Sequence, residues 1–245
     1  GLAGGGTDVS PYCDSYGGYV LNAAIDRYAY AVLKPLDDAV VRFVATDQQS
    51  AVVCSPEPVL HLDGNLNLHK TVYNHMVRYF NQGRPLALEL STFCDAPVGS
   101  GLGSSSTLVV AMIKAFVEYL NFPLDDYAIA HLAFKIERVD CGLQGGRQDQ
   151  YSATFGGFNF MEFGAEDRVI VNPLRVKESV LAELEASIVL YFTGISRESA
   201  NIIREQSRNA ENNVSASVQA MHDLKLEAVQ MKESLLKGDF NALTS

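Results

Sequence analysis

Residues 97–107 have the composition of a loop that binds a ligand. Their sequence, PVGSGLGSSST, has three glycines at alternate positions, then three serines, and the apolar run LVVAMIKAFVEYL follows at once. An ordered glycine costs roughly 0.5–1 kcal/mol relative to alanine, so three together suggest that something approaches this backbone closely. Serines at a helix start can cap its free N–H groups, and those groups with the helix dipole also attract anions. Two interpretations stay open: a phosphate-binding loop, or a glycine-rich turn with a serine cap.

Two carboxylates follow this loop along the chain. Glu137 shares one helical face with three apolar residues at spacings of i, i+3, i+4 and i+7, namely Ala130, Ala133 and Phe134. By itself, it is either an end-of-helix residue in solvent, as most helical charges are, or a carboxylate placed for chemistry. Asp149 follows a glycine-rich turn. Phosphoryl transfer from ATP needs amides for the phosphates, oxygen ligands for Mg²⁺ and an acidic group near the acceptor hydroxyl.

Familiar nucleotide and hydrolase motifs do not fit. A Walker A loop requires lysine directly after its last glycine, but Ser104 follows Gly103. The spacing GxGxG differs from the dinucleotide fingerprint GxGxxG. A protein kinase would need an HRD element, and a hydrolase elbow would need GxSxG, whereas residues 194–198 read GISRE.

Composition limits the partners of this protein. The 245 residues are 47% hydrophobic and 20% charged, with a formal charge of −10. Such an acidic chain is a poor nucleic-acid binder. No apolar run is long enough for a membrane span, and the first residues show no signal-peptide pattern, so we expect no membrane partner. The four cysteines lie far apart, which is typical of reduced thiols in a cytoplasmic protein. The five histidines show no metal-ligand spacing.

Hydrophobic periodicity predicts a mixed β/α first part, to about residue 180, and a smaller and more helical second part. We expect strands at residues 19–33 (with a kink near residue 22), 40–46, 51–55, 86–93, 158–163, 168–171 and 187–194. We expect helices at 68–81, 105–120, 125–138, 198–209 and 214–237. The apolar stripe of the last helix, which includes Val218, Met221 and Leu224, is predicted to face a core rather than a ligand.

At these residues the sequence resembles the GHMP small-molecule kinases, the superfamily of galactokinase, homoserine kinase, mevalonate kinase and phosphomevalonate kinase. PVGSGLGSSST matches the superfamily's second motif, Pro-x-x-x-Gly-Leu-Gly-Ser-Ser, over its full length. The resemblance implies that Ser105 and Glu137 hold Mg²⁺, and that Asp149 acts as general base or orients the acceptor hydroxyl. The implied ATP-binding residues are Pro97, Gly99, Ser100, Gly101, Leu102, Gly103, Ser104, Ser105 and Ser106.

Within the superfamily, the segments GLAGGGTDVSPY, GLGSSST and GGRQDQYSATFGGFNF are most similar to the bacterial heptose phosphate kinases. Those enzymes phosphorylate the anomeric hydroxyl of heptose 7-phosphate on the route to nucleotide-activated heptose for surface polysaccharide. The resemblance implies that a sugar phosphate is the substrate. It makes Gly5, Gly6, Thr7 and Asp8 candidates for holding the sugar hydroxyls. From charge and loop position we add Arg147, Thr193 and Arg197 as candidate substrate contacts. The alternative for the two arginines is a solvated surface position.

The resemblance implies an α+β fold of two domains. Residues 1–180 would form a ribosomal-protein-like ATP-binding domain, and residues 181–245 an incomplete ferredoxin-like domain, with ATP and substrate in the cleft between them. The basic residue of the first motif would precede Gly1, and the third glycine-rich motif would follow Ser245, so we interpret the sequence as a fragment. Other functions stay open: a kinase for fucose or galactose, a non-catalytic sugar or nucleotide sensor, or a decarboxylase of the diphosphomevalonate type. The oligomeric state is left open.

Overall fold

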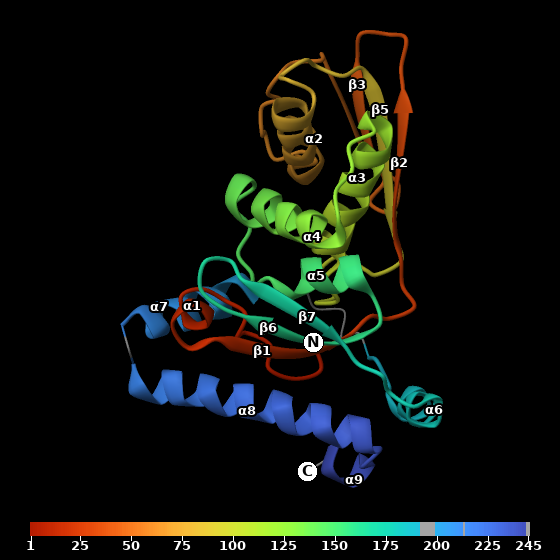
Figure 1. Cartoon of the computed structure of the whole chain (residues 1–245). Helices are drawn as coiled ribbons and strands as arrows, with labels where there is room; N and C mark the ends of the chain where they lie inside the picture. Colours follow the sequence, from red (N-terminus) through yellow and green to blue (C-terminus); the bar gives the residue numbers. More distant parts are fainter. Residues whose placement is uncertain (192–198, 213, 244–245) are drawn as a thin grey trace. The chain divides into compact units, whose positions relative to one another are not determined.

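The computed structural model describes residues 1–191, 199–212 and 214–243. Thr193 and Arg197, two of the predicted substrate contacts, lie outside these ranges. The chain forms two compact units (Figure 1): unit 1 comprises Gly1–Ile25 and Gln144–Ser245, and unit 2 comprises Asp26–Leu143. Within the described ranges, none of the helices combines the length and the apolar character that spanning a bilayer demands.

Unit 2 contains a four-stranded sheet with helices on one face. The strand order is β2-β5-β3-β4, in which β5 runs parallel to β3 and antiparallel to β2. Figure 1 shows α2 and α3 on the same side of this sheet. The elements are β2 (Ala29–Pro35), β3 (Val41–Ala45), β4 (Ser50–Cys54), α2 (Asn67–Phe80), β5 (Leu88–Cys94), α3 (Ser104–Leu120), α4 (Asp126–Phe134) and the π-helical turn η1 (Lys135–Asp140).

The core of unit 2 follows from the predicted periodicities. On β5, Leu88 and Leu90 are buried while Glu89 between them faces the other side of the sheet, as alternation requires. On α3 most of the apolar residues are buried, as expected for a central helix: Leu108, Val109, Val110, Met112, Ile113 and Phe116. The phenyl ring of Phe43 meets the ring of Tyr73 edge-on at 6.0 Å between centroids.

Unit 1 contains a three-stranded antiparallel sheet, ordered β1-β6-β7, with helices on both faces (Figure 1). On β1, Leu21 packs into a core cluster with Ala228 and Leu235 of α8. The next residue, Asn22, points to the opposite face and its side chain accepts a hydrogen bond from Ser152 of α5, at 2.5 Å. The elements are α1 (Tyr12–Tyr16), β1 (Gly18–Ala23), α5 (Gln148–Phe155), β6 (Phe158–Phe163), β7 (Val169–Pro173), α6 (Glu178–Ser187), α7 (Ser199–Glu211), α8 (Ser215–Lys237) and α9 (Phe240–Leu243).

Two strand predictions are wrong. The expected strand at residues 19–33 is two strands, β1 and β2, which belong to different sheets. The exposed polar residues Asp26 and Arg27 separate them. The expected buried strand at 187–194 is also absent in its described part, because α6 extends to Ser187 and no strand pairs with the residues that follow. Val189 and Tyr191 are 87% and 82% exposed.

The compact units do not follow the division expected near residue 180. Strand β1 pairs with β6 along its whole length, from Gly18 opposite Phe163 to Ala23 opposite Phe158. This pairing joins the first 25 residues to the second half of the chain. As a statement about the domains of the family, the boundary near residue 180 remains a prediction.

A buried histidine in unit 2 gives a pH-dependent contribution to stability. The imidazole Nε2 of His69 lies 2.8 Å from Thr92 Oγ1, while its Nδ1 is buried and makes no hydrogen bond within the described ranges. Burial lowers the pKa of His69 from 6.5 to about 4. Between these two values the unfolded chain binds a proton that the folded chain does not. The free energy of unfolding therefore falls as pH drops from 6.5 towards 4, by about 3 kcal/mol in total.

We expect His69→Gln to remove this dependence. Urea unfolding at pH 7.5, 6.5, 5.5 and 4.5 would measure it as the difference in unfolding free energy between the parent chain and the variant. The unfolding free energy of the parent minus that of the variant should decrease steadily as the pH is lowered from 6.5 to 4.5. His61→Gln, at an exposed histidine, is the matched control. A difference that stays constant across the pH range would show that the pKa of His69 is the same in the folded and the unfolded chain.

Candidate active site

The glycine–serine loop of unit 2 leads into the N-terminus of α3. Gly99, Gly101 and Gly103 have φ angles of +76°, +75° and +73°, a region that side chains disfavour. The alternating glycines thus satisfy the backbone conformation of the loop itself. The N-cap of α3 is Gly103 rather than a serine, and this residue makes no side-chain capping hydrogen bond. The interpretation of a serine-capped turn is therefore wrong, and the first N–H groups of a 17-residue helix point toward the loop.

Glu137 is buried at the start of the π-helical turn η1. Its side chain is 1% exposed, so the interpretation of an end-of-helix residue in solvent is wrong. Ser106 Oγ donates to Glu137 Oε2 at 2.7 Å, and Arg138 Nη1 lies 3.3 Å from Glu137 Oε1. The contact with Ser106 was not anticipated. Ser105, the predicted metal ligand, is one position earlier on α3 and half-buried. Residues adjacent on a helix point about 100° apart, so only tertiary packing shows which serine meets the carboxylate.

The oxygen atoms around Glu137 fit a magnesium ion. Among the described residues, no group of three or more His, Cys, Asp or Glu side chains could hold a metal. Mg²⁺, however, keeps several waters and is commonly held by one or two protein oxygens together with substrate phosphates. A buried carboxylate beside the first turn of α3, whose serines supply hydroxyl oxygens, is a donor set of this kind. The buried Ser100 hydroxyl, which makes no hydrogen bond within the described ranges, adds a further donor on the loop.

In unit 1, the N-terminal glycine turn packs directly against β1. A Cβ at Gly4 would overlap the carbonyl oxygen of Tyr19. Thr7 is fully buried, with its hydroxyl 2.7 Å from the carbonyl of Gly4 and 2.9 Å from that of Tyr19. The same hydroxyl accepts a hydrogen bond from Tyr19 N at 3.1 Å. These glycines thus allow close backbone approach, and the Thr7 side chain binds its own turn. Contact of Thr7 with sugar remains a prediction.

Asp8 ties this turn to the helix that carries Asp149. Its carboxylate is buried and accepts hydrogen bonds from Gly6 N at 3.1 Å, Gln148 N at 2.9 Å and Gln148 Nε2 at 3.3 Å. A Cβ at Gly146 would overlap the Asp8 carboxylate. Asp149 lies half-buried in the first turn of α5. The structure therefore brings together two predicted site residues, Asp8 and Asp149, that are 141 positions apart in the sequence. The contact through Gln148 had no signal in the sequence.

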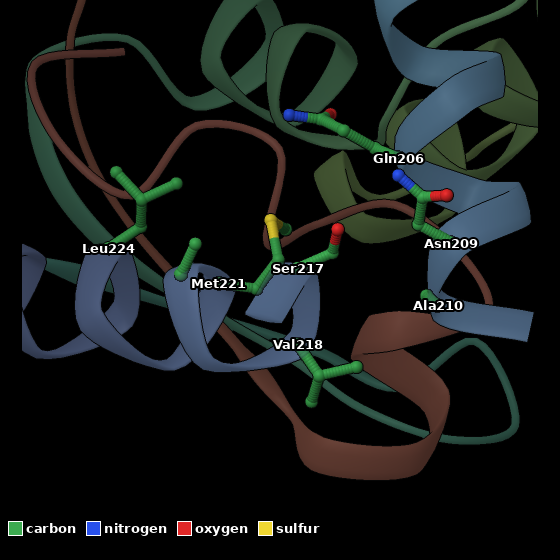
Figure 2. Close-up of a pocket in the computed structure, with 8 residues that line it drawn as sticks. Gln206, Asn209, Ala210, Ser217, Val218, Met221 and Leu224 are labelled. Carbon is green, nitrogen blue, oxygen red and sulfur yellow. The ribbon is translucent and has the colours of Figure 1, made fainter. Parts of the chain in front are cut away.

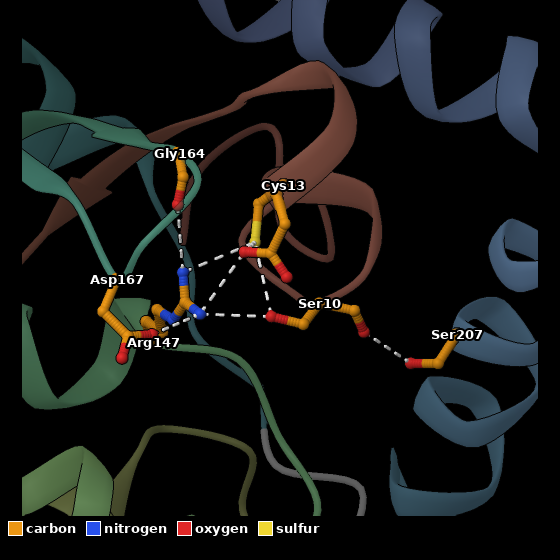
Figure 3. A network of polar contacts seen from close by, with 7 residues as sticks. Ser10, Cys13, Arg147, Gly164, Asp167 and Ser207 are labelled. Carbon is orange, nitrogen blue, oxygen red and sulfur yellow. Dashed lines mark hydrogen bonds and ion pairs between the residues drawn. The ribbon is translucent and has the colours of Figure 1, made fainter.

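Arg147, a predicted substrate contact, is buried rather than exposed. Its side chain is 6% exposed, so the interpretation as a solvated surface residue is wrong. Figure 3 shows its guanidinium between Ser10, Cys13, Gly164 and Asp167. A direct contact of Arg147 with substrate remains a prediction.

A cavity of about 200 Å³ lies between α7 and α8 in unit 1 (Figure 2). Its lining is mixed, with polar side chains from both helices, Gln206 and Asn209 of α7 and Ser217 of α8, beside apolar ones. A Cβ at Gly6 would lie 3.3 Å from Gln206 Oε1, so the Gln206 side chain is next to the glycine turn. The stripe predicted to face only a core therefore also lines this cavity, with Val218, Met221 and Leu224.

Known proteins provide an independent comparison. The family model for the N-terminal domain of GHMP kinases matches residues 67–157. The D-glycero-alpha-D-manno-heptose 7-phosphate kinase of Campylobacter jejuni is 51% identical over 243 residues, which are 99% of this chain and 71% of that protein. The chain belongs to the GHMP kinase family. The matched range includes the loop at 97–107, Glu137 and Asp149.

Solved structures of GHMP kinases agree with this fold. A D-glycero-D-manno-heptose 1-phosphate kinase from Bacteroides thetaiotaomicron is 45% identical, with a TM-score of 0.87 over 99% of this chain and 72% of that chain. The mevalonate kinase of Methanococcus jannaschii has a TM-score of 0.63 at 16% identity, over 96% of this chain and 75% of its own. At that identity only the fold is shared. The predicted α+β GHMP kinase fold is thus confirmed.

Proposed function

We propose that this chain is an ATP-dependent sugar kinase that phosphorylates the anomeric hydroxyl of D-glycero-D-manno-heptose 7-phosphate. The observation that carries the proposal is the 51% identity, over 99% of this chain, to the Campylobacter jejuni heptose 7-phosphate kinase. It is supported by the presence of Glu137 and Ser105, to which the proposal assigns the metal, and of Asp149, to which it assigns the acceptor hydroxyl. As part of the same proposal, the free thiols of the four cysteines fit a cytoplasmic protein.

The nucleotide part of the reaction is assigned to unit 2. The N–H groups of the loop at 97–103 and of the first turn of α3 bind the phosphates of ATP. Ser105 and Glu137 would hold Mg²⁺, which when bound neutralises the developing charge on the phosphates. The buried position of Glu137 keeps its carboxylate in a fixed orientation, because Ser106 and Arg138 contact it on both oxygens.

The sugar part is assigned to unit 1. The turn that contains Gly5, Gly6 and Asp8 binds sugar hydroxyls. Its conformation is fixed by the hydrogen bonds that the Asp8 carboxylate accepts and by the one that the Thr7 hydroxyl donates. Asp149 accepts the proton of the anomeric hydroxyl, or orients that hydroxyl for attack on the γ-phosphorus. Asp8 contacts the N-terminus of the helix that carries Asp149, so sugar binding and proton acceptance are coupled through one short segment.

A pair of serine variants tests the metal assignment. We expect Ser105→Ala to raise the Mg²⁺ concentration for half-maximal activity about 100-fold. Ser106→Ala should raise this Mg²⁺ concentration only about tenfold. That is the lower end of the loss in metal affinity, about 10- to 100-fold, that follows removal of a residue that orients a metal ligand. Activity measured across a Mg²⁺ titration at saturating substrate gives both values. If Ser106→Ala had the larger effect, the metal-facing hydroxyl would belong to Ser106 instead.

The substrate assignment is tested with a panel of sugars in a coupled assay for ATP turnover. Heptose 7-phosphate should have the highest kcat/KM, above free heptose, heptose 1-phosphate, fucose and galactose, and the product should carry its new phosphate at C1. Heptose 1-phosphate is included because the similar solved structure is named for it. A preference for fucose or galactose would reassign the substrate. Absence of product with every sugar would favour a non-catalytic sensor.

A further inference from the structure

Arg147, next to a candidate base, makes several polar contacts through both terminal nitrogens of its guanidinium. Its Nη2 donates to Asp167 Oδ1 at 2.8 Å and to Ser10 Oγ at 3.1 Å. Its Nη1 lies 3.5 Å from the carbonyl of Gly164 and 3.6 Å from Cys13 Sγ. Burial raises the pKa of Cys13 to about 11, so a neutral thiol faces the guanidinium. The contacts come from α1, from the segment before it and from the β6–β7 turn (Figure 3).

The β6–β7 turn presents Asp167 to Arg147 in a conformation that costs energy. Arg168 N donates to the carbonyl of Ala165 at 3.1 Å, and the two residues between them, Glu166 and Asp167, have φ angles of +57° and +56°. Positive φ at both central residues is typical of a type I′ turn, which usually takes Asn-Gly. Asp167, a residue type that can adopt positive φ, instead directs its charge toward the buried guanidinium of Arg147.

The position of Arg147 in the chain connects these contacts to the candidate base. Arg147 is the N-cap residue of α5, and the next residue, Gln148, donates its N–H to Asp8. The start of α5 is therefore tied on one side by the Arg147 side chain and on the other by the Asp8 carboxylate. Since helix geometry is rigid, these ties set the direction of Asp149, the second residue of α5.

We propose that Arg147, together with Asp167, is a positioning residue that orients Asp149 for proton transfer, and that Arg147 does not bind the phosphate of the substrate. This inference rests on the proposed function, in which Asp149 is the base. Charge supports it. Two carboxylates, those of Asp167 and of Asp14 at 3.5 Å, already neutralise the guanidinium. A phosphate group arriving there would meet both of them.

The variant Asp167→Asn separates the two roles of Arg147, because they predict opposite effects. If Arg147 positions Asp149, loss of the charge-assisted bond lowers kcat about tenfold, equally for heptose 7-phosphate and free heptose. If Arg147 binds the phosphate, removing a competing carboxylate lowers KM for heptose 7-phosphate alone. Asparagine tolerates positive φ as aspartate does, so the turn is retained. Glu166→Gln is the matched control, at an exposed carboxylate in the same turn.

A second variant and a structural measurement complete the test. Arg147→Lys keeps the charge but loses the fork geometry, and should lower kcat about 100-fold with KM for heptose 7-phosphate within threefold. A raised KM for heptose 7-phosphate alone, with kcat unchanged, would overturn the proposal. Amide hydrogen exchange of residues 148–155 should be faster in Asp167→Asn and unchanged in Glu166→Gln. If no sugar is phosphorylated by the parent protein, the proposed function fails, while unchanged exchange in Asp167→Asn rejects the positioning contact independently.

Discussion

Asp149→Asn is expected to lower kcat for sugar phosphorylation roughly 10³-fold, within the range for loss of a general base. Asparagine has the same shape but cannot accept the proton of the anomeric hydroxyl. Affinity for ATP should stay within about twofold, because the proposed phosphate contacts are backbone N–H groups of the loop at 97–103 and of α3. Single-turnover measurements with saturating ATP would separate the chemical step from product release, and ATP affinity would be measured by calorimetry.

The control for this variant is an acidic residue in the first turn of another helix. Asp126→Asn, in the first turn of α4 at an exposed position, changes the charge by the same amount. It should leave kcat within twofold. If Asp149→Asn kept near-normal turnover with ATP bound, then Asp149 would not be the base, and the positioning role inferred for Arg147 would lose its target.

Gly146→Ala is expected to impair both stability and sugar phosphorylation. The added methyl group would occupy the position of the Asp8 carboxylate, which holds the glycine turn and the start of α5 together. Overpacking together with loss of these hydrogen bonds should lower the free energy of unfolding by about 3 kcal/mol. Because Asp8 and Asp149 would both move, kcat/KM for the sugar should fall at least 100-fold, at the same time as the urea midpoint decreases.

Gly164→Ala provides the matched comparison for Gly146→Ala. A Cβ at Gly164 would meet only the Cβ of Arg168, at an ordinary distance of 4.0 Å, and the Gly164 carbonyl would still reach Arg147. Its stability and activity should remain close to those of the parent chain. A stable and active Gly146→Ala variant would mean that the Asp8 carboxylate is not required in its present position.

The two substitutions with the largest expected effects affect the same short segment. In residues 146–149, Gly146 lies close to the Asp8 carboxylate, and Arg147 makes the contacts with Asp167 and its neighbours. Gln148 donates its N–H to Asp8, and Asp149 is the candidate base. An enzyme gains when its reactive groups are held by several fixed contacts, because misplacement by about 1 Å can cost a factor of about 10² in rate. The density of buried polar contacts around this segment is consistent with such a requirement.

Local patterns in the sequence were enough to predict those helices and strands that can be identified without knowing what they pack against. Period-2 alternation identified β5, and helical spacing identified α2, α3 and α8 to within one or two residues, since both periodicities follow from backbone geometry alone. The motif at 97–107 determined the family. Glu137 shares an apolar helical face with Ala130 and Ala133, and this spacing is consistent with its burial in the structure. The spacing did not decide the question, because most helical charges are exposed.

Tertiary structure alone decided which side chains meet. Sequence spacing could not show that Ser106 contacts Glu137, that Asp8 caps the helix of Asp149, or that Arg147 is enclosed by Asp167 and Cys13. It also could not divide residues 19–33 between two sheets. Each of these outcomes depends on chain segments that lie far apart in the sequence, and periodicity carries no information on contacts of that kind. The type of chemistry was thus encoded in local sequence, while the orientation of the groups that perform it depends on packing across the fold.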